Sequence, residues 1–129
     1  MRYAETDQMG VVHHAAYVPW LEQGRVDWLE HLDLRYSELE KSGVLFPVTD
    51  ISISYRRPLR FGEVVEVETW LTQLASRKLT FTYRVYGNGD RRVRASGLTV
   101  HVPQDRSGLA RRLPDQIFDL LAGAAEIET

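Results

Sequence analysis

The residues best suited to chemistry lie near the start of the chain. Asp7 and Gly10 belong to a segment with the composition of a turn. His13 and His14 follow, where a helical pattern begins. A helix N-terminus carries unpaired N–H groups and about half a positive charge, so it can stabilise the oxyanion formed when a carbonyl is attacked. A nearby carboxylate can act as a general base toward water or as a nucleophile. These groups would suffice to hydrolyse a thioester, whose thiolate leaves readily.

Simpler interpretations of the same segment stay open. Asp7 alone could be a turn or capping residue. His13 and His14 could be a metal pair, but adjacent side chains at a helix start point apart and no third ligand is evident, so we expect no metal site. His14 could contribute its ring, or only its backbone N–H at the mouth of the helix.

A helix is predicted over residues 15–32. Pro19 lacks a backbone N–H and fits only in the first turn, which places the start near Ala15 or Ala16. The apolar side recurs at intervals of three and four residues, at Tyr17, Trp20, Leu21, Gly24, Trp28, His31 and Leu32.

Two further features of this helix lead to structural expectations. Gly24 costs a helix about 1 kcal/mol relative to alanine. Its place on the apolar side therefore predicts a close approach to another backbone. Glu22 and Arg25 are three residues apart, the spacing of an ion pair on a helix surface.

A second, shorter helix and a change of period follow. Ser37-x-x-Glu40 matches a capping box, and Gly43 would end that helix. Beyond Gly43 apolar residues alternate with polar ones, which predicts strands with one buried face. The apolar positions are Ile51, Ile53 and Tyr55; Val65, Val67, Thr69 and Leu71; Leu79, Phe81, Tyr83 and Val85; then Val93 and Ala95, followed in the other phase by Leu98, Val100 and Val102.

Glycine and proline mark the boundaries of the later elements. Gly97 lies where the last strand changes phase, which predicts a β-bulge there. The sequence Gly87-Asn88-Gly89-Asp90 predicts a turn between the third and fourth strands. Residues 114–121 could form a closing helix.

These elements predict an α+β fold with a long central helix. Four antiparallel strands have one apolar face, and the helix over residues 15–32 is the only predicted element long enough to cover it. We therefore expect a sheet wrapped around that helix. At 129 residues the whole chain, 1–129, is expected to form one domain.

Composition excludes several classes of function. The absence of cysteine excludes disulfides, thiolate zinc sites and a cysteine nucleophile. A formal net charge of -2 gives no indication of nucleic-acid binding. No apolar run approaches about 18 residues and no signal-peptide pattern is present, so we expect a cytoplasmic protein without integral membrane association. The arginines at 56–57, 91–94 and 111–112 are expected mainly on solvated faces.

The motifs resemble a known family. The chain contains Arg2-Tyr3, Glu5-Thr6-Asp7, Gly10-Val11-Val12, His14, Tyr17, Glu22 and Arg25, and later Tyr55-x-x-Pro58 with Gly62-Glu63 and Ser76-Arg77 leading to Phe81. This pattern resembles the 4-hydroxybenzoyl-CoA thioesterase branch of the hotdog superfamily, which includes the acyl-CoA thioesterases associated with the Tol-Pal system. His13 stands where tyrosine is common and Ala16 where asparagine is common. Because the motif starts at Arg2, either the family's first strand is cut short or the start of the chain is mis-set.

The resemblance implies roles for individual residues. Asp7 would be the catalytic carboxylate, as nucleophile or general base, and His14 would supply its backbone N–H to the thioester carbonyl. The other expected substrate contacts are Gly10, Val12, His13 and Tyr17. Candidates for binding the coenzyme A phosphates are Arg57, Ser76, Arg77 and Lys78.

The resemblance also implies an assembly and an activity. We expect a homodimer or homotetramer with active sites between subunits, and an acyl-CoA substrate lying along the surface. No cofactor is expected, since coenzyme A is part of the substrate. The leading hypothesis is hydrolysis of acyl-CoA to a carboxylic acid and coenzyme A. The alternatives are a hotdog dehydratase or isomerase acting on acyl thioesters, and a non-catalytic module that binds acyl-CoA. The acyl group, and whether coenzyme A or a carrier protein bears it, stay open.

Overall fold

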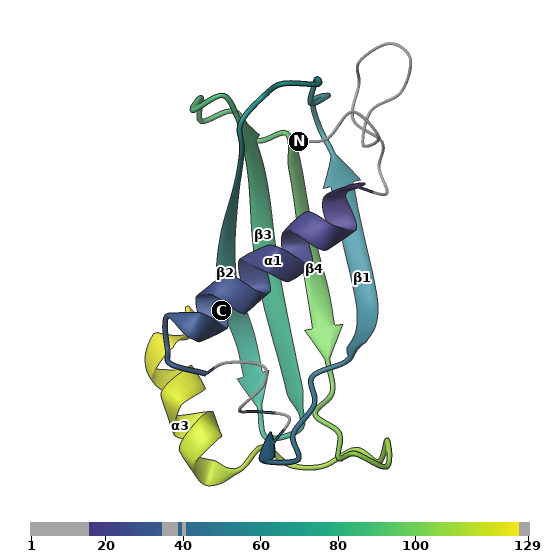
Figure 1. Ribbon diagram of the computed structural model, residues 1–129, viewed down its shortest axis with the longest axis vertical. Helices are drawn as coiled ribbons and strands as arrows, with labels where there is room; N and C mark the ends of the chain where they lie inside the picture. Colours follow the sequence, from purple (N-terminus) through teal and green to yellow (C-terminus); the bar gives the residue numbers. More distant parts are fainter. Residues whose placement is uncertain (1–15, 35–38, 40, 127–129) are drawn as a thin grey trace.

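The computed structural model describes residues 16–34, 39 and 41–126, and the predicted elements in this part are present (Figure 1). Their bounds are α1 Tyr17–Glu30, β1 Val48–Tyr55, β2 Val65–Ala75, β3 Lys78–Gly87, β4 Ala95–His101 and α3 Asp115–Ala124. Helix α1 ends at Glu30, two residues before the predicted end. Pro19 lies in its first turn, as expected.

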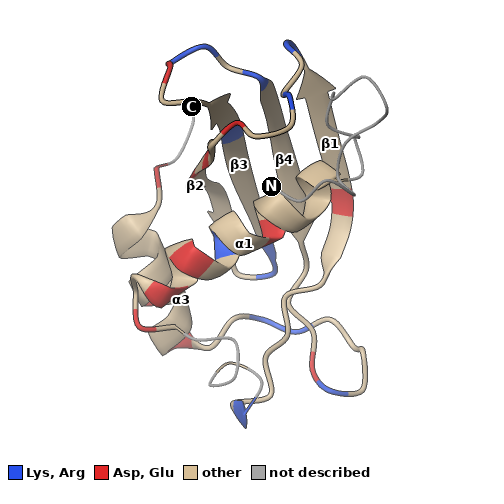
Figure 2. Ribbon diagram, turned by 45° about the horizontal axis from the view of Figure 1, so that its top comes forward, with Lys and Arg blue, Asp and Glu red and all other residues tan. Residues whose placement is uncertain are grey.

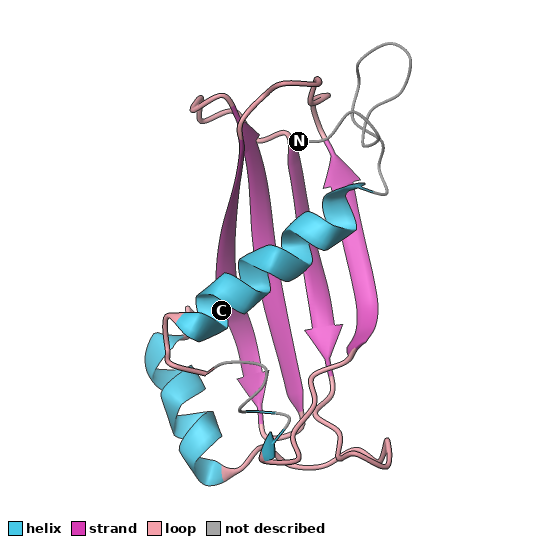
Figure 3. Ribbon diagram, viewed as in Figure 1, coloured by secondary structure: helices cyan, strands magenta, loops and turns pink. Residues whose placement is uncertain are grey.

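The four strands form one antiparallel sheet in the order β1-β4-β3-β2. Helix α1 crosses one face diagonally, beginning beside β1 and ending toward β2, near α3 (Figure 1). Figure 3 shows the connecting loops gathered at the two ends of the sheet. The predicted packing of a helix on the sheet is therefore confirmed. No helix in the described part of the chain is long and apolar enough to cross a membrane.

The side of α1 that faces the sheet differs in part from the predicted one. Its buried residues follow a spacing of four: Tyr17, Leu21, Arg25 and Leu29. Trp28 is only half-buried and packs edge-on against Phe81, with ring centroids 5.4 Å apart. His31 is exposed and lies beyond the helix. The prediction of an exposed Glu22–Arg25 surface pair is wrong in its placement of Arg25, which is only 5% exposed.

A chain of hydrogen bonds accounts for the burial of Arg25. Its Nη1 donates to the Tyr83 hydroxyl at 3.2 Å, Tyr83 contacts Thr99 Oγ1 at 2.6 Å, and Thr99 contacts His101 Nε2 at 2.8 Å. The other ring nitrogen of His101, Nδ1, lies 3.0 Å from the Phe46 carbonyl. This chain joins α1 to β3, β4 and the segment before β1.

The protonation state of His101 fixes the direction of these bonds. Burial, and then the positive charge of Arg25, lower the pKa of His101 to about 4, so the ring is neutral at pH 7. The Phe46 carbonyl can only accept, so Nδ1 carries the proton and Nε2 accepts from Thr99. Thr99 then accepts from Tyr83, whose oxygen accepts from Arg25. Each group in the chain thus has a partner of the right kind.

The predicted close approach at Gly24 is confirmed, although its neighbours are side chains and not a backbone. A Cβ atom added to Gly24 would lie 2.6 Å from Thr69 Oγ1 and 3.1 Å from Val67 Cγ1. Both neighbours belong to β2. Glycine therefore lets the middle of α1 lie directly on the sheet.

Two expectations about the strands are wrong. Strand β1 does not have one buried face: it is at the edge of the sheet formed by the described strands, and Ile51 and Tyr55 are 46% and 41% exposed. Gly97 forms no bulge, since β4 keeps continuous register with both neighbours there. Instead, Leu98 and Val100 point away from the α1 side. A Cβ at Gly97 would lie 2.7 Å from the Ser52 carbonyl oxygen, so glycine is needed for close strand packing.

The predicted ends and turns agree with the structure where it describes them. Gly43 has φ of +84°, and the Val44 N–H donates to the Leu39 carbonyl at 3.0 Å, the pattern of a glycine-terminated helix. Ser37 and Glu40, the predicted capping box, lie outside the described residues. Asn88 and Gly89 have positive φ in the predicted turn.

Replacing Gly24 with alanine should destabilise the protein. The gain in helix propensity is at most about 1 kcal/mol, whereas forcing a methyl group against β2 costs about 1–3 kcal/mol. We expect a net loss of about 1–2 kcal/mol in urea denaturation. Adding Thr69→Ala should recover most of it, because Thr69 Oγ1 makes no hydrogen bond among the described residues.

Gly123→Ala in α3 is the matched control. A Cβ there meets nothing within 4 Å, so its free energy of unfolding should stay the same or rise slightly. A Gly24→Ala variant as stable as the wild type would contradict the tight contact.

Candidate functional site

The start of α1 and the end of β1 meet at one end of the sheet. Tyr17, the first residue of α1, contacts Tyr55, the last residue of β1, with ring centroids 5.1 Å apart. Trp20, one turn further along, lies 5.1 Å from Tyr17. Tyr17 is buried, and burial, followed by the nearby Tyr55, raises its pKa, so its hydroxyl stays neutral. The predicted site residue Tyr17 therefore lies in an aromatic cluster at this end.

The described part of α1 begins after Ala16, whose φ and ψ of -70° and -23° are already helical. Ala16 occupies the N-cap position, makes no side-chain bond, and no acidic residue lies in the first turn. Helix starts usually carry a serine, threonine, aspartate or asparagine that bonds the free N–H groups. In general, the N–H groups at a helix start and their partial positive charge favour a nearby negatively charged oxygen.

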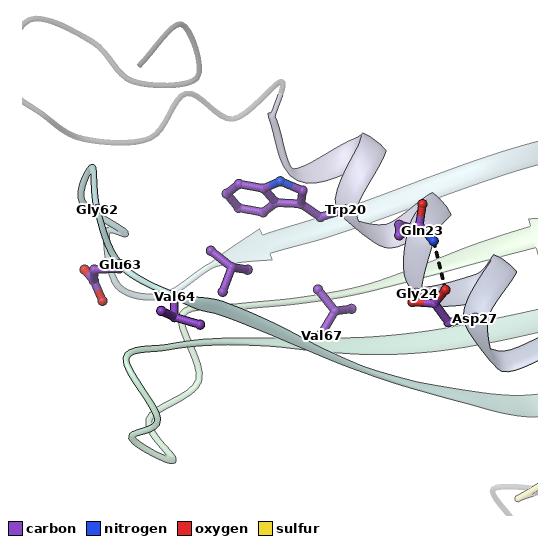
Figure 4. A pocket seen from close by; sticks show the side chains of 9 residues that line it. Trp20, Gln23, Gly24, Asp27, Gly62, Glu63, Val64 and Val67 are labelled. Atoms are coloured by element: carbon purple, nitrogen blue, oxygen red, sulfur yellow. Dashed lines mark hydrogen bonds between the residues drawn. The ribbon is translucent and has the colours of Figure 1, made fainter. Parts of the chain in front are cut away.

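A cavity of about 580 Å³ lies between α1 and β2 (Figure 4). Figure 4 shows Trp20 on the α1 side and Val67 across from it on β2. On the outer side of α1, Gln23 Nε2 donates to Asp27 Oδ1 at 2.8 Å. The cavity wall is apolar toward the sheet and polar at its rim, and consists of Trp20, Gln23, Gly24, Asp27, Gly62, Glu63, Val64, Val65 and Val67.

Arg94 joins the two loops at this end of the sheet. Its guanidinium donates to the Pro58 carbonyl at 3.0 Å and contacts Glu63 at 3.0 Å and Asp90 at 3.1 Å. Its own carbonyl accepts the backbone N–H groups of Arg56 and Arg57 at 2.9 and 3.1 Å. The loop of residues 56–64 and the loop of residues 88–94 are thus held together by one residue.

Arg94 departs from the expectation that the 91–94 cluster is solvated. Its side chain is only 12% exposed, as is that of Glu63. The Arg92 backbone N–H and then the Arg94 guanidinium lower the pKa of Asp90, so that carboxylate stays charged. Arg94 and Glu63 are 31 residues apart in the chain, and their contact depends on how the strands align. The spacing of residues in the sequence therefore could not predict this ion pair.

The other predicted site residues are distributed over both ends of the sheet. Arg57 is exposed in the 56–64 loop, at the end where α1 begins. Ser76, Arg77 and Lys78 lie at the turn between β2 and β3, at the far end of an 11-residue strand that spans about 36 Å. One phosphate cannot contact both sets within one chain.

The remaining predicted residues cannot be placed. Asp7, Gly10, Val12, His13 and His14 all lie outside the described residues. Within residues 16–34, 39 and 41–126, no three His, Asp or Glu side chains form a group that could hold a metal ion.

Comparison with known proteins identifies the family. The family model described as "Thioesterase-like superfamily" matches residues 1–121. The chain belongs to this superfamily. Its sheet and covering helix are the hotdog fold, as predicted. The matched region includes the Asp7-to-His14 segment, both arginine-bearing loops and the α1–β2 cavity.

Individual relatives support the assignment. The putative acyl-CoA thioesterase YneP of Bacillus subtilis is 49% identical over 86 residues, which are 67% of this chain and 62% of YneP. The alignment thus spans less than two thirds of that relative's length. The structure is similar to a hypothetical protein, TT1821, from Thermus thermophilus, with a TM-score of 0.89, 48% identity, and coverage of 96% of this chain and 94% of that one. A DHNA-CoA thioesterase from Staphylococcus aureus gives a TM-score of 0.85 at 30% identity, covering 96% and 83%.

Replacing Arg94 with glutamine should destabilise the protein and separate the two loops. Glu63 would keep a largely buried carboxylate with no cation, at a cost of about 1–3 kcal/mol. Arg91→Gln is the matched control, because Arg91 pairs with Glu68 at 2.6 Å but is 67% exposed, and such pairs contribute less than about 1 kcal/mol. Guanidinium denaturation of both variants measures the difference. Equal losses would show that Arg94 is not the tether.

Proposed function

We propose that the protein hydrolyses acyl-CoA thioesters to a carboxylic acid and coenzyme A. The observation that carries the proposal is the motif Glu5-Thr6-Asp7 through His14 within a region matched to the thioesterase-like superfamily. The position of α1 supports it, because the start of a helix, which can stabilise an oxyanion, follows this motif directly in the chain. The names of YneP and of the S. aureus protein agree with the same chemistry.

Asp7 carries out the reaction by one of two routes. As a general base it takes a proton from water while the water oxygen bonds to the acyl carbon. As a nucleophile its oxygen bonds to that carbon directly, giving a mixed anhydride that water then cleaves. In both routes the thioester oxygen becomes negative and is stabilised by the N–H groups near His14, and the carbon–sulfur bond breaks to release the coenzyme A thiolate.

The α1–β2 cavity supports an apolar acyl group as substrate. Trp20 and Val67 offer apolar surface on opposite walls, and Val64 at the mouth is 68% exposed. A cavity with apolar walls favours an apolar ligand. Gly10, Val12, His13 and Tyr17 are proposed to contact the substrate near the reacting carbon. The reaction needs no separate cofactor, and we assign it to the cytoplasm.

Replacing Asp7 with asparagine should reduce turnover by at least about 100-fold, because the amide can neither accept a proton nor attack. Thiol release from a panel of acyl-CoAs, followed with a thiol-reactive dye, measures this. Asp119→Asn is the control, since it removes an exposed carboxylate from α3 and should leave turnover unchanged.

Each other result of this assay has a definite meaning. An Asp7→Asn variant as active as the wild type would contradict the role of Asp7. Tight acyl-CoA binding without thiol release by the wild type would favour the non-catalytic module. Loss of the enone absorbance of an enoyl-CoA would favour a dehydratase.

A homodimer formed through β1 is the proposed assembly. Among the described residues β1 pairs on one side only, with β4. Its sequence has a single charge, Asp50, and its exposed apolar residues include Val48, Ile51 and Tyr55, at 44%, 46% and 41%. An exposed apolar edge strand favours pairing with another strand. Because Tyr55 contacts Tyr17, a partner at this edge would lie beside the start of α1.

Ile51→Lys should shift the protein from dimer to monomer, because a charge would be buried between the two edges. Light scattering coupled to size-exclusion chromatography should give twice the mass of one chain for the wild type and the mass of one chain for the variant. Leu120→Lys in α3 is the matched control. The Leu120 side chain is 48% exposed, similar to Ile51, and this variant should remain dimeric. A monomeric wild type would rule out this assembly.

A further inference from the structure

The end of the sheet opposite the start of α1 carries a strong local positive charge. Three segments meet there, 41–43, 76–78 and 104–112, and they contain six cations and one carboxylate, a net charge of +5, whereas the whole chain is at -2. Figure 2 shows the loops of this end, with their blue segments, below the strands. We call this surface the basic end, and its cations are Lys41, Arg77, Lys78, Arg106, Arg111 and Arg112.

Hydrogen bonds hold the three segments of the basic end together. Arg106 Nη2 donates to the Lys41 carbonyl at 3.2 Å, which joins the third segment to the first. The N–H of Leu113, just beyond the third segment, donates to the Ser76 carbonyl at 2.7 Å and joins it to the second. Cations from distant parts of the sequence therefore share one surface.

Four of these cations form no ion pair with a carboxylate in the described part of the chain. The only acidic residue within the three segments, Asp105, directs its Oδ1 to N–H groups of its own loop. The next acidic residue along the chain is Asp115, the first residue of α3. The four cations are all exposed, and they are Lys41, Arg77, Lys78 and Arg112.

The loop of residues 105–109 presents a leucine to water on a well-defined turn. Leu109 is 67% exposed. Asp105 Oδ1 accepts from the N–H groups of Ser107 and Leu109 at 2.9 and 3.1 Å, and the Asp105 N–H donates to the Leu109 carbonyl at 2.9 Å. Gly108 has the positive φ of this turn, +87°. Because the backbone holds this apolar side chain outward, its burial against a partner would be favourable.

We propose that the basic end is a peripheral docking surface for an anionic lipid bilayer, with Leu109 entering the headgroup region. Anionic bilayer surfaces attract lysine and arginine, and apolar side chains buried among the headgroups add to the binding. The cations are distributed over separate loops, as an extended surface with many negative charges requires. The contact is peripheral, since no described helix is long and apolar enough to cross a membrane.

Co-sedimentation with lipid vesicles tests the surface. The wild type should bind vesicles of phosphatidylcholine and phosphatidylglycerol in equal parts but not vesicles of phosphatidylcholine alone, and binding should weaken as salt is raised. The double variants Arg77→Gln/Lys78→Gln and Lys41→Gln/Arg112→Gln should each bind about tenfold more weakly. Leu109→Ser should bind about threefold more weakly.

Matched variants separate this surface from a general effect of charge or of apolar area. Arg60→Gln/Arg92→Gln removes two exposed arginines at the other end of the sheet, and Leu120→Ser removes a leucine that is 48% exposed on α3. Both variants should bind vesicles as the wild type does. Equal weakening in these controls would overturn the proposal, as would a wild type that does not bind the anionic vesicles. Unchanged binding by both cation variants would overturn the surface, and unchanged binding by Leu109→Ser would overturn the insertion of the leucine.

Competitors distinguish a bilayer from other anionic partners. At constant ionic strength, release of the protein from vesicles by inorganic phosphate or by coenzyme A would indicate a site for one phosphate ligand. Binding to poly-glutamate without binding to vesicles would indicate an acidic protein as partner. Either result would overturn the proposal. Vesicle binding is measured without a thioester, so its outcome is independent of the proposed hydrolysis.

Discussion

The position of α1 on the sheet depends on the contact of Gly24 and Arg25 with the strands beneath them. Gly24 brings the helix against Thr69 and Val67, and Arg25, the next residue, donates into the chain that ends at His101 and the Phe46 carbonyl. The first interaction limits the distance between helix and sheet, and the second limits sliding and rotation, because hydrogen bonds are directional. A buried guanidinium is costly unless its donors are satisfied, so displacement of α1 would be penalised. These contacts therefore also fix the position of the start of α1, where the chemistry is proposed.

A second constraint acts on the loops at the same end of the sheet. The Arg94 guanidinium donates to the Pro58 carbonyl and contacts the carboxylates of Glu63 and Asp90. Its carbonyl accepts hydrogen bonds from two backbone N–H groups of the 56–64 loop. The residue thus serves the structure and is itself unavailable to a ligand. Both carboxylates of the loops contact Arg94 and Arg91 pairs with Glu68, so Arg56, Arg57, Arg60 and Arg92 form no ion pair with a described carboxylate. One ion-pair cluster therefore joins the two loops.

Strand β1 connects the proposed assembly to the proposed site. Its apolar side chains are exposed because no described strand lies beyond it, while its last residue, Tyr55, packs against the first residue of α1. A second copy at this edge would bury Ile51 and exclude water close to the helix start. Exclusion of water strengthens electrostatic stabilisation of a developing oxyanion. Assembly and catalysis are in this way expected to depend on the same few residues.

The sequence by itself determined the elements and their order, because these depend on local periodicity. It also determined the turn at Asn88–Gly89, the end of a helix at Gly43 and the tight packing at Gly24, because each needs a backbone or a close approach that only certain residues allow. It also identified the family, through the motif from Arg2 to Tyr17. Only the tertiary structure decided that Arg25 is buried, that β1 is an exposed edge, that Gly97 stays in register, and that Arg94 pairs with Glu63. These properties follow from the strand order β1-β4-β3-β2, which brings together residues far apart in the chain. Local spacing carries no information about such contacts, because they are fixed by which faces and edges the assembled sheet covers.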